Sequence, residues 1–174
     1  MRSQFIRTAS IICILSMVLA GCGSVPKSDQ KKEVKSFANK IYQQEQSITK
    51  DLSEFVDVFS QLEEDEGNVN LGDLSTISKA LKRDYLSVHT GLSKMKSPKS
   101  LPSDLSDLLN SGAQELSSAY LERSQGLDSL IKFSNYQSPS ELIDFQKNMA
   151  KTQSELQDAK QKIKEASKKV GLNK

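Results

Sequence analysis

The sequence has few of the residues that build reactive or cross-linked sites. It contains one histidine, two cysteines, four prolines and no tryptophan in 174 residues. A single histidine cannot supply the ligands of an ordinary zinc site, and no phosphate-binding loop or nucleophile motif stands in a suitable setting. We therefore predict no catalytic residue, no metal site and no cofactor, which is to say a protein that is not an enzyme.

The chain also lacks an excess of charge of either sign. Lysine and arginine number 24 and aspartate and glutamate 22, and only Arg2 and Arg7 fall within residues 1–21. The remainder of the chain is therefore neutral overall. A neutral chain does not produce the broad positive field on which nucleic-acid binding depends, so we expect no nucleic-acid partner.

What is present at the N-terminus is a short ordered set of signals. Arg2 and Arg7 precede an apolar run at residues 9–20, which ends in the tetrapeptide Leu19-Ala20-Gly21-Cys22. A run of roughly a dozen residues fits the apolar region of a signal peptide and is too short for a membrane-spanning helix, which needs about 20. The tetrapeptide resembles the lipobox of bacterial lipoprotein precursors. The alternative is an ordinary secretory signal with a chance cysteine.

The lipobox resemblance implies a covalent lipid anchor. Cleavage would fall between Gly21 and Cys22, the Cys22 sulfur would carry a diacylglyceryl group, and the new amino terminus could receive a further acyl chain such as palmitate. This divides the chain into a signal peptide at 1–21, a lipidated cysteine with a flexible linker at 22–29, and a helical domain at 30–174. The implied location is the extracytoplasmic face of the cell membrane, with membrane lipid as the partner of the anchor.

The rest of the chain has a seven-residue apolar repeat that predicts an all-α fold. Such a repeat is typical of long helices that pack nearly parallel to their neighbours, as in coiled coils. The pattern predicts four helices at about 30–64, 71–95, 103–136 and 139–170, joined by short turns in an antiparallel up-down four-helix bundle. The clearest repeats are Val34, Ile41, Ile48, Phe55 and Leu62, and Leu142, Met149, Leu156, Ile163 and Val170.

Local signals mark the ends of the helices. Ser138 and Glu141, with Pro139 between them, have the spacing of a capping box at the start of the fourth helix. Gly171 is a stop signal at its end, after which Leu172 can fold back. The Lys96-Ser97-Pro98 turn, followed by a leucine-rich helix, is similar to small uncharacterised helical lipoproteins of Gram-positive bacteria. That resemblance implies no particular molecular function.

Lysines gather at three places that an up-down bundle would bring to one end. These are the start of the first helix, the turn between the second and third, and the end of the fourth. The anchor at Cys22 would place that end at the membrane, and anionic lipids attract such basic clusters. The predicted anionic-lipid contacts are Lys27, Lys31, Lys32, Lys35, Lys96, Lys99, Lys168 and Lys169. The acidic run at 63–66 would lie at the opposite end.

Two functions from different classes remain open. The first is a non-enzymatic interaction or structural module that presents a helical surface to an unknown envelope protein. The second is a small-ligand or chaperone-like carrier with a cavity beside the small residues Gly112, Ala119 and Gly126, which otherwise serve close helix packing. Two further side chains bear on this choice: we expect Glu45 to extend from the edge of its apolar stripe to solvent, and His89 to be exposed.

Overall fold

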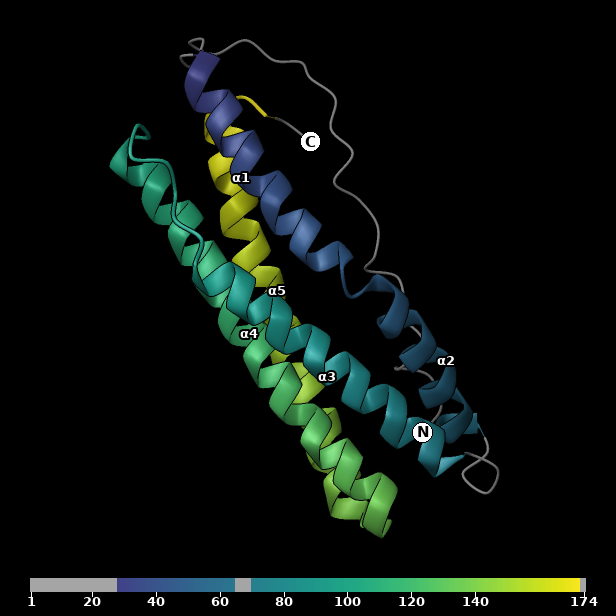
Figure 1. Ribbon diagram of the computed structural model, residues 1–174. Coiled ribbons are helices and arrows are strands. Elements are labelled where there is room, and N and C mark those ends of the chain that lie inside the picture. The colour runs from purple at the N-terminus through teal and green to yellow at the C-terminus, as the bar shows by residue number, and fades with distance from the viewer. Residues whose placement is uncertain (1–27, 65–69, 173–174) are drawn as a thin grey trace.

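The computed structural model describes residues 28–64 and 70–172, without the side chains of residues 63 and 64, and every element in this part is a helix (Figure 1). The all-α prediction is confirmed for these residues. The signal peptide, the lipobox, Lys27 and most of the acidic run at 63–66 lie outside the described residues. The helices are α1 (Ser28–Gln46), α2 (Thr49–Glu64), α3 (Leu71–Ser93), α4 (Ser103–Tyr136) and α5 (Pro139–Lys169).

The single first helix predicted at 30–64 is wrong, because the chain breaks between α1 and α2. Neither proline nor glycine causes the break. The Ser47 hydroxyl instead donates to the carbonyl oxygen of Gln44 at 2.7 Å, and the amides of Ser47 and Ile48 make long bonds of 3.3 and 3.4 Å to the third preceding residue. A serine that bonds the backbone in this way bends a helix. The seven-residue repeat continues through the break, since Ile48 and Phe55 are both buried.

Consecutive helices around α4 run in opposite directions. Lys82 of α3 meets Asp128 of α4, whereas Ser97, after α3, meets Asn110 near the start of α4. In the same way Lys132 of α4 reaches Glu141 of α5, and Lys169 at the end of α5 reaches Asp104 at the start of α4. One end of the molecule therefore holds the start of α1, the α3–α4 turn and the end of α5, as Figure 1 shows.

Leucine and aromatic side chains fill the space between the helices. Tyr85 of α3 packs against Tyr120 of α4, with ring centroids 5.6 Å apart. On the α2 side, Phe55 and Phe59 meet Phe145 of α5 at 6.1 and 5.4 Å. Aromatic pairs at these separations add about 0.5–1.5 kcal/mol beyond the area they bury. The side chains with essentially no exposure include Leu74, Leu81, Leu92, Leu109, Leu116, Leu127 and Leu130.

The stripe of small residues on α4 is where α5 comes closest. A Cβ atom on Gly112 would lie 2.5 Å from Cδ1 of Ile163 and 3.1 Å from the carbonyl oxygen of Ala159. One on Gly126 would lie 2.3 Å from Oδ1 of Asn148. Ala119, between them, has no exposed surface. Of the two interpretations of this stripe, close packing within the protein is therefore the one that the contacts favour.

Of the two helix-end signals predicted from the sequence, the stop at Gly171 is confirmed and the capping box is not. Asn70 caps α3, since its side chain accepts from the amides of Gly72 and Asp73. Gly171 is left-handed after α5, and the Leu172 amide bonds back to Ser167. The capping box at the start of α5 is wrong. Ser138 occupies the N-cap position, but its hydroxyl bonds Ser140 and no backbone amide of the helix. The Glu141 carboxylate lies 3.8 Å from Nζ of Lys132 on α4.

We predict that Gly112→Ala destabilises the protein. The added methyl group overpacks the α4–α5 contact, which costs about 1–3 kcal/mol, and the better helix propensity of alanine returns about 1 kcal/mol. The expected net loss is about 1 kcal/mol of unfolding free energy, measured by urea denaturation followed by circular dichroism. Gln125→Ala, on the exposed face of α4, is the control and should not destabilise. An equal gain in unfolding free energy in both variants would mean that the α4–α5 contact accommodates the added methyl group.

Candidate functional site

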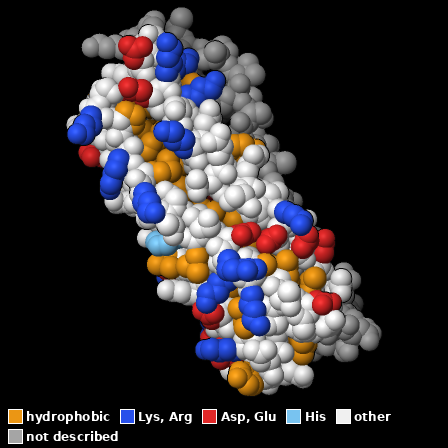
Figure 2. All heavy atoms as spheres, viewed as in Figure 1, with side chains coloured by type: hydrophobic (Ala, Val, Ile, Leu, Met, Phe, Trp, Pro, Cys, Tyr) orange, Lys and Arg blue, Asp and Glu red, His pale blue; other side chains and the backbone are white. Residues whose placement is uncertain are grey.

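The structure brings most of the predicted lipid-contacting lysines to one end of the molecule. We call this the basic end. It contains the start of α1, the α3–α4 turn and the end of α5, and all but one of its lysines are exposed, Lys31 being half-buried. Figure 2 shows lysine side chains gathered there, with acidic side chains among them. The lysines are Lys31, Lys32, Lys35, Lys94, Lys96, Lys99, Lys164, Lys168 and Lys169.

Acidic side chains neutralise part of this charge. Lys169 pairs with Asp104 at 2.9 Å, and their hydrogen bond raises the pKa of Lys169 and lowers the pKa of Asp104. Glu33 accepts a hydrogen bond from the Ser100 hydroxyl at 2.7 Å. Lys169 is therefore partly committed to joining α5 to α4, whereas Lys96 and Lys99 have no described acidic partner. The electrostatic field at this end is therefore positive, but it is interrupted where acidic side chains lie.

The α3–α4 turn holds two of these lysines on a fixed backbone. The amide of Ser97 donates to Oδ1 of Asn110 at 2.9 Å, and the hydroxyls of Ser97 and Ser106 are 2.5 Å apart. Nearby Leu101 is 7% exposed and anchors the turn in the core. Lys96 and Lys99 thus project from a turn that side-chain hydrogen bonds secure on α4.

A second polar feature, which the sequence did not indicate, crosses the interior between α1, α4 and α5. Oε1 of Glu45 accepts a hydrogen bond from the Tyr120 hydroxyl at 2.7 Å and lies 2.9 Å from Nζ of Lys160. The Glu45 side chain is only 18% exposed, so the expectation that it extends to solvent is wrong. The reason is that α4 and α5 each present a donor at the point where α1 passes.

The surroundings of this cluster keep Tyr120 protonated. Burial, and then the neighbouring Glu45 carboxylate, raise the pKa of Tyr120 well above its ordinary value. Burial also raises the pKa of Tyr85, which packs on Tyr120. Tyr120 is therefore a hydrogen-bond donor throughout the physiological range. The cluster therefore keeps this proton on the Tyr120 hydroxyl, where Glu45 accepts it as a hydrogen bond.

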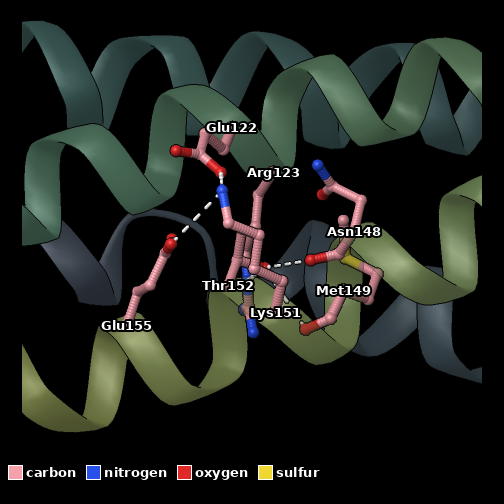
Figure 3. Close-up of polar contacts among 7 residues, drawn as sticks. All are labelled: Glu122, Arg123, Asn148, Met149, Lys151, Thr152 and Glu155. Atoms are coloured by element: carbon pink, nitrogen blue, oxygen red, sulfur yellow. Dashed lines mark hydrogen bonds and ion pairs between the residues drawn. The ribbon is translucent and has the colours of Figure 1, made fainter.

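Between α4 and α5 lies a row of polar contacts, of which Figure 3 draws those among Glu122, Arg123, Lys151, Thr152 and Glu155. Arg123 donates to the Thr152 hydroxyl at 3.2 Å and to Gln153 at 2.7 Å. Lys151 lies between Glu122 and Glu155 at 2.5 and 3.4 Å, and the hydrogen bond to Glu122 is the main cause that raises the pKa of Lys151. These contacts pair cationic side chains with acceptors along the α4–α5 interface. They oppose a lengthwise shift of α5 along α4.

His89 joins α3 to α4. Its Nδ1 lies 2.9 Å from the Ser117 hydroxyl, and that hydroxyl donates to the His89 carbonyl oxygen at 3.1 Å. The expectation of an exposed histidine is wrong, because the ring is half-buried against α4. Ser117 is 4% exposed, so a substrate could not reach its hydroxyl, and the pair serves helix packing.

In the part of the chain that the structure describes, no three His, Cys, Asp or Glu side chains come together as metal ligands would. Over the same ranges, 28–64 and 70–172, no helix combines the length and apolar character needed to cross a membrane. Comparisons with protein-family models, curated proteins and solved structures find no match to this chain.

We predict that Glu45→Ala destabilises the protein by about 1–3 kcal/mol, because the Tyr120 hydroxyl then loses its acceptor inside the core. The measurement is the free energy of unfolding in urea. Glu54→Ala is the control, since Glu54 pairs only within α2 and is half-exposed; it should change stability by less than about 0.5 kcal/mol. Equal effects of the two substitutions would mean that Glu45 contributes no more than a surface charge.

Proposed function

We propose that this chain is a lipid-anchored cell-envelope protein that serves as a non-enzymatic interaction or structural module on the extracytoplasmic face of the membrane. The observation that carries the proposal is the tetrapeptide Leu19-Ala20-Gly21-Cys22 directly after a basic and apolar leader. A helical domain begins at Ser28, a few residues later. A lipid on Cys22 would hold this domain close to the bilayer, since the intervening backbone spans at most ~20 Å.

We further propose that the domain is an up-down four-helix bundle in which α1 and α2 count as one interrupted member. Support comes from the antiparallel contacts between α3 and α4 and between α4 and α5. The contacts of Glu45 place α1 against α4 and α5. This topology puts the attachment point of the anchor at the basic end.

In this arrangement the basic end faces the lipid headgroups. Each well-placed lysine adds about 1 kcal/mol of attraction to an anionic membrane surface, less as salt increases. Lys96 and Lys99 are the best placed, because both are exposed on the secured α3–α4 turn. The alternative of a carrier with a cavity beside Gly112 and Gly126 gains no support, because Ile163 and Asn148 occupy that space.

We predict that Cys22→Ala abolishes lipid attachment. Cells given a palmitate analogue with a clickable tag should label the wild-type protein and leave the variant unlabelled, and the variant should keep residues 1–21. Cys13→Ala is the matched control, because it removes the other cysteine and should leave labelling unchanged. Labelling that persists in Cys22→Ala, or that disappears in Cys13→Ala alone, would contradict the anchor.

We also predict that the basic end binds anionic membranes without the lipid. The chain from residue 22 onward, carrying Cys22→Ala and so free of the apolar leader, should sediment with vesicles of phosphatidylglycerol and phosphatidylcholine and not with phosphatidylcholine alone. Adding Lys96→Gln and Lys99→Gln should weaken binding about tenfold, because two lysine attractions are lost. Lys79→Gln with Lys147→Gln, both exposed on other parts of the surface, is the control. Equal binding to both vesicle types, or to neither, would contradict the membrane-facing role of this end.

A further inference from the structure

The last turn of α1 is fastened to three other helices. Glu45 bonds Tyr120 of α4 and Lys160 of α5. The neighbouring Gln44 side chain lies on the backbone of α3, so closely that a Cβ on Gly91 would be 2.2 Å from its Oε1. These contacts are directional, and they come immediately before the break at residues 47–48. The chain is therefore firmly held on the α1 side of the break.

Beyond the break, the described charged side chains of α2 do not attach it to its neighbours. Lys50 pairs with Glu54 of the same helix at 3.6 Å. Asp51 faces Asp84 of α3, a contact between like charges, and burial followed by this neighbouring carboxylate raises the pKa of Asp84. The contact opposes the docking of α2 on α3 when both groups are ionised.

Apolar contacts hold α2 in place, and they are incomplete. Phe55 is buried against Phe145 of α5, and Phe59 stacks on Phe55 at 5.6 Å. Leu62 is also buried, whereas the remaining apolar side chains of its inner face are partly exposed. Apolar attraction is non-directional and scales with buried area, so a helix held this way separates with less cost than one held by buried polar bonds. These partly exposed residues are Leu52, Val56, Val58 and Phe59.

The break itself has the geometry of a hinge. The amides of Ser47 and Ile48 make only long bonds to the third preceding residue. Regular helical bonding resumes with the Leu52 amide, which donates to the Ile48 carbonyl oxygen at 2.9 Å. Rotation here disturbs no regular hydrogen bond of either helix. We propose that α2 is a hinged arm, which opens as one unit about Ser47 and Ile48 away from α3 and α5 while α1 stays docked. Opening uncovers the Phe145 ring and the apolar surface around it.

This proposal is independent of the lipid anchor, and amide hydrogen exchange of the full chain tests it. Followed by NMR at single-residue resolution, the amides of residues 52–61 should share one protection factor. That factor should be at least tenfold lower than the protection of residues 38–46, with a step at the break. A gradient that rises steadily from residue 61 towards residue 48 indicates fraying and overturns the proposal. So does equal protection of α1 and α2.

Two variants sharpen the test. Asp51→Asn removes the like charge opposite Asp84 and should raise protection several-fold across α2 alone. Asp57→Asn, an exposed neutralisation on the same helix, is the matched control and should leave protection unchanged. If protection of α2 is unchanged in Asp51→Asn, or rises equally in all five helices, the proposal that α2 opens as a separate unit is overturned. In Glu45→Gln the low protection of α2 should extend into residues 42–46, because the last turn of α1 is then held less firmly against α4 and α5.

Discussion

The contact between α4 and α5 at their small residues determines where the other helices can lie. At Gly112 an added methyl group would collide with the Ile163 side chain and come within 3.1 Å of the Ala159 carbonyl oxygen, and at Gly126 it would collide with the Asn148 side chain. Leucines on either side interdigitate only at this separation, as close-packed interiors require. The opposite flank of α4 then receives α3 through Tyr85 and His89. The first helix is placed last in this hierarchy, on a surface that the other three have already formed.

The half-buried carboxylate of Glu45 is what makes that placement specific. A seven-residue apolar repeat permits neighbouring helices to slide by one heptad with little change in buried area. Glu45 removes this freedom, since only one register aligns it with both Tyr120 and Lys160. Polar groups inside coiled coils define register in the same way, at some cost in stability. The row of contacts from Arg123 to Gln153 does so for α5 on α4.

The repeat made most of the fold predictable, whereas side-chain partners were not. Every member of the series from Val34 to Leu62 is buried, and the gathering of lysines at one end followed from the alternation of helix direction. The break at Ser47 was hidden because Ile48 keeps the repeat and no proline or glycine marks the position. The partners of Glu45 lie 75 or more residues away in sequence, so no local pattern reveals them. The lipid anchor rests on the sequence of residues 1–22 alone, and it stays a prediction.

The order of the helices along the chain also bears on how the domain folds. Pairs such as α3 with α4 and α4 with α5 join neighbours in sequence, and proteins rich in such local contacts fold within microseconds to milliseconds. The contact between Glu45 and Tyr120 spans 75 residues, so its formation carries a larger loop-closure entropy. Hairpins should therefore assemble before α1 docks. Of the described helices, the one that is synthesised first is therefore the last to find its binding surface.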